Sequence, residues 1–233
     1  MLIALYKGQR VRAQVAGSGA IGTCPWTGRQ VKACAGKILQ YWAYVGGAPE
    51  LPPGYEPESE WHEQWKSTIK DDCCEVVMGE NKEHRADILG SDNTVIEIQR
   101  SRIDIRESQA RVDFYRARTG RRVIWVVDIQ DIWRESFRLD GDRDDKGRFL
   151  VKWSPVRNWL KDLIGDTDTN CYLEFNQTSD KLLHAWGHDK KLYAKYVAKR
   201  TFFMRYMDDV AKPEYKNYPP EAEAFLRRSL VKA

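Results

Sequence analysis

The stretch "RVIWVVD", residues 122–128, constrains the fold more than any other part of the chain because it is apolar on both faces of an extended strand. A strand with one wet face alternates polar and apolar residues, whereas an uninterrupted apolar run is typical of a strand covered on both sides. Just before it, a helix is predicted at 105–118, where Asp104 and Glu107 resemble a capping box and Gly120 follows the last turn. The sequence therefore predicts a central strand reached by a helical crossover.

The region before this crossover is predicted to contain one helix and three strands. Ser59 can cap a helix, whose expected buried stripe is Trp61, Trp65, Ile69 and Cys73. A polar stripe beside it holds His62, Lys66 and Lys70. In the later helix, Ala110, Phe114 and Ala117 are expected to face inward. Strand signals at 75–78, 84–89 and 94–101 give the order α-β-β-β-α-β from residue 59.

Turn and proline signals divide the chain into four predicted parts. Residues 1–48 are a small β-rich module with strands at 2–6, 11–15, 29–34 and 38–45, and residues 49–58 are a Pro-rich linker. Residues 59–130 form the core, and residues 131–233 form a C-terminal α+β extension with strands expected at 146–153, 171–175 and 181–186. The aromatic-rich stretch 190–207 has no pattern that assigns it. The expected class is a mixed α+β or α/β fold.

Composition limits the environment of the protein. The chain of 233 residues is 42% hydrophobic, which suits a globular protein, and no apolar run approaches the roughly 20 residues that span a bilayer. We therefore expect a cytoplasmic protein with no membrane partner. The five cysteines have no repeated spacing, so reduced thiols are expected.

Two carboxylates are predicted to face each other in a hairpin of "HRADIL" and "TVIEIQRS". With a loop of residues 91–93, the register places Asp87 opposite Glu97, and Gln99 shares their face. Facing carboxylates repel each other, and a divalent cation between them would offset that cost. The alternative is an ordinary wet face of an antiparallel sheet, which commonly carries Asp, Glu and Gln.

The surrounding motifs resemble a known nuclease family. An Asp followed ten residues later by Glu-x-Gln resembles the PD-(D/E)xK arrangement, with Gln in place of Lys. The segments "HEQWK", "EHRADIL", "VIEIQRSRI" and "RVDFY" are similar to the nuclease domain of the competence protein CoiA family over residues 58–130. The resemblance implies a restriction-endonuclease-like core that hydrolyses phosphodiester bonds of DNA.

The same resemblance implies roles for individual residues. Asp87 and Glu97 would hold Mg²⁺ or Mn²⁺, the Ile98 carbonyl would complete the shell, and Gln99 would position the attacking water. His62 and Lys66 match the His-x-x-x-Lys helix of the family, and Lys66 would add positive charge. Either Glu63 or Glu75 is a candidate for an additional acidic ligand.

The amino-terminal module resembles the small zinc-binding domain of that family in degenerate form. "CPWTG" stands where a Cys-Pro-x-Cys knuckle is expected, and "YWAYVGG" replaces the segment with two histidines. Cys24 is retained and Cys34 is available, but tetrahedral zinc needs four ligands. We therefore do not expect zinc.

Eight arginines between residues 100 and 122 give a local excess of positive charge that suits a nucleic-acid partner, and the family resemblance implies DNA more than RNA. The residues expected to contact the backbone are Arg100, Arg102, Arg106, Arg111, Tyr115, Arg116 and Arg118. The alternative is a solvated Arg-rich helix face. A homodimer is an open option, because nucleases that cut both strands often work in pairs. A second function class is a catalytically inactive binding or adaptor protein, since the usual Lys and the zinc ligands are missing.

Overall fold

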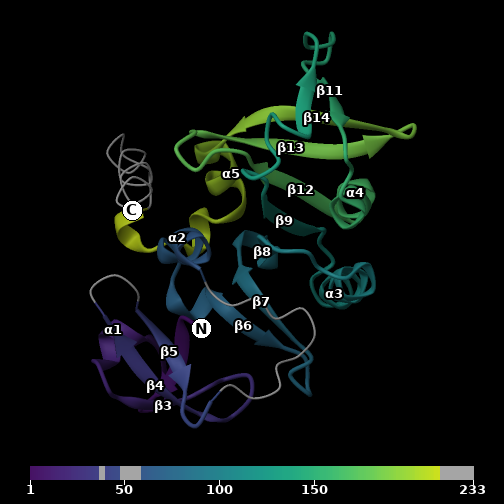
Figure 1. Ribbon diagram of the computed structural model, residues 1–233. Coiled ribbons are helices and arrows are strands. Elements are labelled where there is room, and N and C mark those ends of the chain that lie inside the picture. Colours follow the sequence, from purple (N-terminus) through teal and green to yellow (C-terminus); the bar gives the residue numbers. More distant parts are fainter. Residues whose placement is uncertain (37–39, 48–58, 216–233) are drawn as a thin grey trace. The chain divides into compact units, whose positions relative to one another are not determined.

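The computed structural model has a mixed α+β fold and describes residues 1–36, 40–47 and 59–215 (Figure 1). The chain divides into two units. Among the described residues, the first unit comprises Met1–Leu89 and Val210–Lys212, and the second comprises Gly90–Asp209 and residues 213–215. The division falls inside the predicted core of residues 59–130. The predicted Pro-rich linker at 49–58 lies outside the described residues.

A five-stranded antiparallel sheet forms the amino-terminal part of the first unit, in the order β2-β1-β3-β4-β5. Its strands are β1 (Ile3–Tyr6), β2 (Gln9–Arg12), β3 (Ile21–Thr23), β4 (Gln30–Ala35) and β5 (Gln40–Tyr44). Strands predominate in the described residues here, as predicted, but only residues 11 and 12 of the strand predicted at 11–15 are in a strand. The chain leaves the extended conformation after Arg12 and forms the short helix α1 (Ala13–Ala16), with Ala13 fully buried.

Trp42 organises the core of this sheet. Its indole N–H donates to the Val11 carbonyl at 3.1 Å, and its ring lies among small buried residues that include Ala4 and Ala33. A Cβ at Gly22 would meet the Leu5 carbonyl oxygen at 2.8 Å and the Trp42 ring at 3.0 Å. Glycine is therefore required where the strand passes this ring.

The first unit also contains helix α2 (Glu60–Ser67) and the antiparallel pair β6 (Cys74–Met78) and β7 (His84–Leu89). The cap predicted at Ser59 is confirmed, and its oxygen accepts the His62 N–H. The helix ends earlier than predicted, because the chain turns at Thr68. Ile69, predicted in the helical stripe, instead forms an isolated bridge with Ala211.

A mostly antiparallel sheet with one parallel region forms the second unit, in the order β10-β11-β14-β13-β12-β9-β8. Its strands are β8 (Val95–Gln99), β9 (Val123–Asp128), β10 (Phe137–Asp140), β11 (Phe149–Trp153), β12 (Thr169–Glu174), β13 (Lys181–His188) and β14 (Lys191–Ala198). Every residue of β9 is buried, and β9 pairs in parallel with both β8 and β12. The prediction of a central strand is confirmed.

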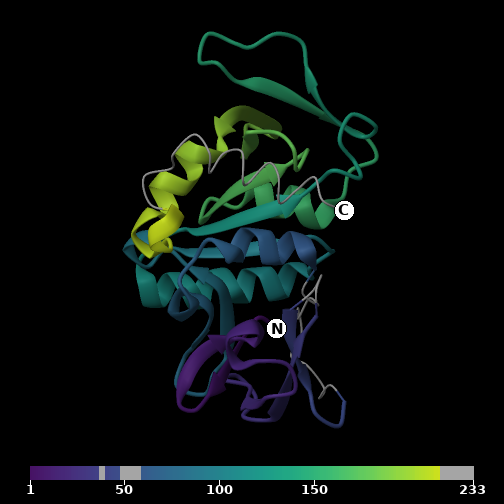
Figure 2. The same ribbon diagram turned by 90° about the vertical axis from the view of Figure 1, so that its left-hand side faces the viewer.

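Helix α3 (Ile105–Thr119) connects β8 to β9 and is seen side-on in Figure 2. Asp104 caps its first turn and Gly120 ends it in the left-handed conformation, as predicted, but Glu107 pairs with Arg111 and is not seen to close a capping box. The predicted inward face is wrong, because Ala110 and Ala117 are exposed. The buried residues of the helix are Ser108, Arg111, Val112 and Tyr115.

Two further helices, α4 (Asn158–Gly165) and α5 (Lys199–Tyr206), belong to the second unit. The predicted strands near 146–153, 171–175 and 181–186 are confirmed as β11, β12 and β13, and the unassigned stretch 190–207 is strand β14 followed by α5. The β10–β11 hairpin projects from the end of this sheet in both Figure 1 and Figure 2. Within the described ranges, no helix has the length and apolar character needed to cross a membrane.

Candidate functional site

The carboxylate of Asp87 in the first unit forms a close ion pair with Lys66. Asp87 lies on β7, and its Oδ1 is 2.7 Å from Nζ of Lys66 on α2. The Lys66 side chain has no exposed surface, whereas 15% of the Asp87 side chain is exposed. A fully buried ammonium group is rare unless it is paired. The sequence placed Lys66 on a polar stripe, and the structure buries it because Asp87 neutralises its charge.

The local sequence fixes the helix that carries this lysine. The Ser59 backbone N–H donates to Nδ1 of His62 at 3.4 Å, while the His62 N–H is directed at the Ser59 hydroxyl, which makes a reciprocal cap. Lys66 follows one turn later on the same face. Arg12 supports the end of the helix by donating to the Lys66 carbonyl at 2.9 Å. His62 thus has a defined structural role in addition to its predicted one.

Opposing effects determine the pKa of Asp87. Burial alone would raise that pKa, but the charge of Lys66 acts against it, followed by His62, the hydrogen bond from Lys66, and Arg85. The net effect lowers the pKa of Asp87 below its ordinary value. The carboxylate is therefore ionised at neutral pH and able to act as a ligand.

Glu75 performs a structural task in the first unit. Its carboxylate accepts the Leu2 N–H at 3.1 Å and the Ile3 N–H at 3.0 Å. Its Oε1 also lies 3.8 Å from Lys66 Nζ and 3.7 Å from an Arg85 nitrogen. These contacts hold the start of β1 against β6, so the Glu75 carboxylate has a structural role.

Glu63, the other candidate acidic ligand, is half-buried on α2. Burial raises the pKa of Glu63 most, and Arg12 opposes that effect.

In the second unit, Glu97 is paired with the helix that follows its strand. Glu97 on β8 is buried, and its Oε2 lies 2.7 Å from Nη1 of Arg111 on α3. The Nε of Arg111 donates to Glu107 at 2.8 Å, one turn earlier on the same helix. Burial lowers the pKa of Arg111, but Glu97 and Glu107 more than compensate, so the net pKa is raised and the guanidinium stays charged.

Gln99 and Ile98 lie at the end of the same strand. The Gln99 side chain is buried, and its amide nitrogen donates to the Ser101 carbonyl at 2.8 Å. Ile98 is buried opposite Val126 in the parallel ladder. The Gln99 amide nitrogen is thus engaged by the backbone two residues later. The predicted role of Gln99 in positioning the attacking water stays a prediction.

The ion pairs change the electrostatic argument made from the sequence. Asp87 belongs to the first unit and Glu97 to the second, and the predicted register that joins them stays a prediction. Each carboxylate already has a cation at 2.7 Å, so a metal is not required to offset their repulsion. Over residues 1–36, 40–47 and 59–215, no three His, Cys, Asp or Glu side chains gather as a metal-holding group. Mg²⁺ commonly uses one or two carboxylates together with waters and phosphate oxygens, so each of these side chains has the chemistry of a Mg²⁺ ligand.

The predicted nucleic-acid contacts differ in their exposure. Arg111 is 8% exposed and Tyr115 is fully buried, so neither side chain presents itself to a backbone phosphate. The helix can bury Arg111 because Glu97 and Glu107 neutralise it. The remaining predicted arginines are exposed, namely Arg100, Arg102, Arg106, Arg116 and Arg118.

Two of these exposed arginines are already engaged in ion pairs. Arg116 pairs with Asp168, and Arg100 lies 3.5 Å from Asp128. Arg118 covers the Phe114 ring at 3.5 Å. Arg102 and Arg106 make no ion pair with any described residue, which leaves them as the arginines most available to an anion.

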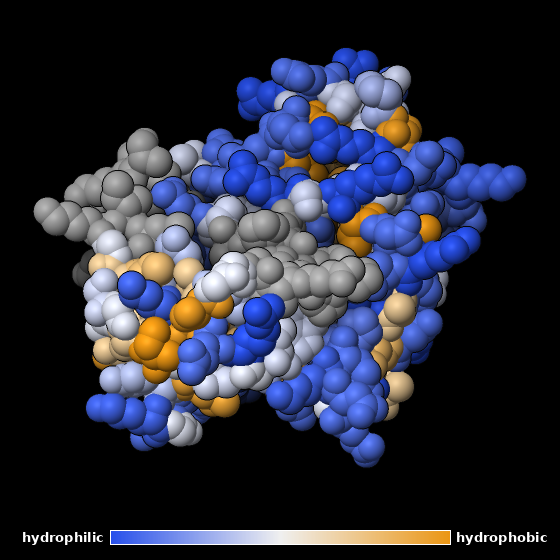
Figure 3. All heavy atoms as spheres, turned by 60° about the horizontal axis from the view of Figure 1, so that its bottom comes forward, coloured by the Kyte–Doolittle hydropathy of each residue, from blue (hydrophilic) through white to orange (hydrophobic). Residues whose placement is uncertain are grey.

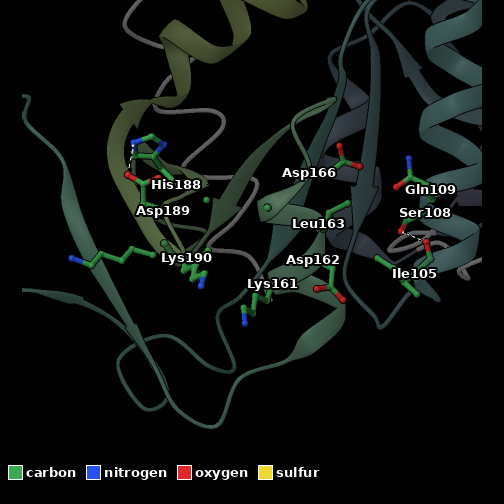
Figure 4. A pocket seen from close by; sticks show the side chains of 14 residues that line it. Ile105, Ser108, Gln109, Lys161, Asp162, Leu163, Asp166, His188, Asp189 and Lys190 are labelled. Carbon is green, nitrogen blue, oxygen red and sulfur yellow. Dashed lines mark hydrogen bonds and ion pairs between the residues drawn. The ribbon is translucent and has the colours of Figure 1, made fainter.

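A cavity of about 810 Å³ lies in the second unit, between the start of α3, helix α4 and the β13–β14 turn (Figure 4). Lys161 and Lys190 line it together with Asp162 and Asp166. His188 pairs with Asp189 at 3.2 Å on its wall. None of the predicted site residues lines this cavity, and its mixed charges favour no single ligand class.

Other apolar residues and the cysteines carry less information. Hydrophilic residues predominate on the face in Figure 3, and hydrophobic ones gather there in small patches. The exposed large hydrophobic residues of the described first unit are Val15, Ile21 and Val45. All five cysteines are free thiols, and the Cys24 sulfur lies 3.2 Å from the Tyr44 hydroxyl. Scattered apolar residues of this kind are normal on a protein surface.

No family model, curated protein or solved structure matches this chain. The function must therefore be argued from the residues themselves. The sequence analysis did not single out Arg85, which lies near Glu75, and assigned Glu107 to a capping box where it instead holds Arg111 in place. The spacing of Glu107 and Arg111, four residues apart on a helix, was a usable signal for their pair. No local pattern links Arg111 to Glu97, which lies fourteen residues earlier.

Proposed function

We propose that this protein is a metal-dependent nuclease that hydrolyses phosphodiester bonds of DNA, with Asp87 and Glu97 as ligands of Mg²⁺ or Mn²⁺. The observation that carries the proposal is the buried Lys66 ammonium group at 2.7 Å from Asp87. Gln99 occupies the position where the resembled nuclease motif has a lysine, and an amide cannot supply positive charge. Lys66, which lies on helix α2, supplies a cation next to the proposed metal ligand Asp87 in place of the missing motif lysine.

Each proposed residue has a distinct chemical role. A bound divalent ion would lower the pKa of a water and stabilise charge on the scissile phosphate. Lys66 keeps Asp87 ionised and orients its carboxylate. Arg111 orients the Glu97 carboxylate through its 2.7 Å ion pair. The Gln99 carbonyl oxygen would accept a hydrogen bond from the attacking water, since its amide nitrogen is engaged by Ser101.

The order of elements supports a restriction-endonuclease-like core in this proposal. Helix α2, strands β6, β7 and β8, helix α3 and strand β9 follow one another as the nuclease resemblance predicts. The parallel pairing of β8 and β9 across α3 is consistent with that topology. In this proposal the amino-terminal sheet is a degenerate zinc-ribbon-like module without zinc.

A second candidate function is a DNA-binding or adaptor protein that has no turnover. The observation that favours it is the pairing of each carboxylate with its own buried cation. Such pairs are stable without metal, and a scaffold that lost catalysis could retain them for folding alone. This candidate predicts DNA binding without cleavage under any divalent ion.

Arg102 and Arg106 are the proposed phosphate contacts of the nuclease. Each phosphate contact on duplex DNA contributes about 0.9 to the slope of log affinity against log salt. A variant with Arg102→Gln and Arg106→Gln should flatten that slope by about 1.8. A variant with Arg121→Gln and Arg122→Gln removes the same charge beyond the end of α3 and serves as the control. Equal slopes for both variants would contradict the assignment.

The central experiment is DNA cleavage with plasmid and single-stranded substrates in Mg²⁺, Mn²⁺ and EDTA. We expect cleavage with either metal, none in EDTA, and a loss of at least about 100-fold for Asp87→Asn. The matched control is Asp92→Asn, because that side chain is 73% exposed in the turn before β8. Lys66→Arg should retain more activity than Lys66→Met.

The outcomes separate the two candidates. Cleavage that persists in EDTA, or that Asp87→Asn leaves intact, refutes the metal-dependent mechanism. Calorimetry that detects Mn²⁺ binding lost in both Asp87→Asn and Glu97→Gln, with no product from either substrate, favours the binding protein. DNA binding that is equal in all variants, without metal uptake, also favours it.

A further inference from the structure

Four aromatic rings form a row across one face of the sheet in the second unit. The register places His184 beside Tyr172 of β12, and Trp186 beside Tyr193 of β14. The ring centroids of Tyr172 and His184 are 4.7 Å apart, those of His184 and Trp186 are 5.3 Å apart, and those of Trp186 and Tyr193 are 6.2 Å apart. Neighbouring planes differ by 21° to 37°. We call these four residues the ring row.

One end of the ring row is covered and the other is open. Tyr172 is buried beneath α5, where its hydroxyl lies 3.0 Å from that of Tyr206. His184, Trp186 and Tyr193 are only half-buried. An antiparallel sheet normally places polar residues on a face that no helix covers. Partly exposed rings in register on such a face are therefore a feature to explain.

Cations surround the open part of the ring row. In the β13–β14 register, Lys195 lies opposite His184 and Lys191 lies opposite His188. The Arg148 guanidinium lies over the Tyr193 ring at 4.8 Å. Arg138 and Lys152 of the β10–β11 hairpin continue the same face through the Leu150 and Tyr193 pair.

Only part of this charge is neutralised. Asp144 pairs with Arg148 at 2.6 Å, and Asp140 pairs with Lys152 at 2.8 Å. Arg205 of α5, which lies over the Tyr206 ring, adds a further cation next to this face. No ion pair with any residue of the described ranges is made by the remaining cations, namely Arg138, Lys191, Lys195 and Arg205. The face has an excess of positive charge.

The titration of His184 reflects the same excess. Burial lowers the pKa of His184 most, and the charges of Lys195 and Arg205 lower it further, to about 4. The imidazole is therefore neutral at pH 7 and behaves as an uncharged ring. Its neighbours supply the charge, and it supplies stacking surface.

We propose that the ring row and the cations around it bind single-stranded DNA. Bases of a single strand stack on aromatic side chains, and lysines and arginines beside them contact the phosphates. A duplex keeps its bases stacked inside and offers no base faces to Trp186 or Tyr193. An acidic peptide would match the charge but would leave the rings without a partner.

The site does not rest on the proposed metal chemistry, because none of its residues belongs to the Asp87 or Glu97 clusters. It would hold a strand in place while the rest of the second unit is free to bind duplex DNA through α3. A strand-holding platform of this kind suits proteins that act where duplex and single strand meet. The binding test is accordingly done in EDTA.

The experiment measures binding of a fluorescein-labelled 15-nucleotide thymidine strand by polarisation in EDTA. Loss of one stacked base weakens binding by about 5- to 150-fold, which we expect for Trp186→Ala and for Tyr193→Ala. Trp186→Phe keeps a ring and should restore most of the affinity. The matched control is Tyr196→Ala, which removes the same ring as Tyr193→Ala from the opposite face of the same strand.

Charge and stacking are tested separately. Lys191→Gln with Lys195→Gln should flatten the salt dependence of single-strand binding by about 1.4. Lys161→Gln with Lys190→Gln removes equal charge from the cavity of Figure 4 and should leave the slope unchanged. None of these variants should alter duplex binding by more than about twofold. Circular dichroism and thermal unfolding verify that each variant is folded.

Several results would overturn the proposal. Equal single-strand affinity in Trp186→Ala, Tyr196→Ala and the unaltered protein excludes the ring row. Parallel losses of single-strand and duplex binding indicate a general electrostatic effect. Tighter binding of a uridine RNA strand than of the thymidine strand replaces DNA with RNA as the ligand.

Discussion

Replacing Lys66 by methionine isolates the contribution of the buried ion pair to the first unit. The ammonium group is fully buried and lies 2.7 Å from Asp87. Methionine fills a similar volume but leaves the carboxylate without its nearest cation. Removing one partner of a buried pair typically costs about 3–5 kcal/mol of the free energy of unfolding. We expect a loss of that size at pH 7.

The pH dependence of this loss follows from the pKa of Asp87. In the unaltered protein that pKa lies below its unfolded value, so the stabilisation is present at neutral pH and is lost as pH falls through the folded pKa. In Lys66→Met the largest effect that lowers this pKa is removed, so we expect burial to raise the pKa of Asp87 above the unfolded value of about 3.9, with His62 and Arg85 opposing it. The variant then gains stability as pH falls from 7. The difference in stability between the two proteins should therefore narrow toward pH 4.

Hydrogen exchange measured by mass spectrometry is the suitable assay, because it reports the free energy of opening for individual peptides. Peptides covering β6 and β7 should lose protection in Lys66→Met. Lys70→Met alters an exposed position just beyond the same helix and should change the free energy of opening of these peptides by less than about 0.5 kcal/mol. Adding Asp87→Asn to Lys66→Met should recover part of the loss, which a double-mutant cycle quantifies. A loss below about 1 kcal/mol, or one that grows at low pH, would refute the reasoning.

Three further substitutions test other parts of the structure. Glu75→Gln places an amide nitrogen next to the backbone N–H groups that now donate to the carboxylate. It should lower the free energy of unfolding by about 1–3 kcal/mol, measured as faster hydrogen exchange in β1. Gly90→Ala would bring a Cβ against the Tyr206 backbone carbonyl and should lower the unfolding temperature by the equivalent of about 1–3 kcal/mol, whereas Gly165→Ala, with open space around it, should not. Arg111→Met leaves Glu97 buried without its cation and should cost about 3–5 kcal/mol at pH 7 in chemical denaturation; a loss no greater than that of the exposed Arg118→Met would contradict the pairing.

Periodicity and capping carried most of the fold prediction. The run at 123–127 is a fully buried strand because no polar residue interrupts it on either face. Ser59, Asp104 and Gly120 marked helix ends correctly, since their chemistry acts within one turn. Strand β14 was missed because its aromatic residues lie on both faces and leave no simple alternation.

The failures share a physical cause, which is that long-range partners decide burial. Lys66 and Arg111 carry full charges, so their types alone favour the surface. Each is buried because a carboxylate distant in sequence neutralises it. The inward face of α3 was misjudged for the same reason, since apolar residues alone defined the predicted stripe. Predicting such a face requires the tertiary partner, and only the Glu107 and Arg111 spacing was locally visible.

The return of Val210–Lys212 to the first unit has a consequence for synthesis on the ribosome. Ile69 and Ala211 pair in a bridge, both fully buried, and the Lys212 N–H donates to the Thr68 carbonyl at 2.9 Å. The ribosome must synthesise the whole of Gly90–Asp209 after Ile69 and before Ala211. At about 5–20 residues per second, that interval lasts roughly 6–24 s. During this time the nascent first unit exposes Ile69, and chaperone binding to arrested chains should end once residue 212 has left the tunnel.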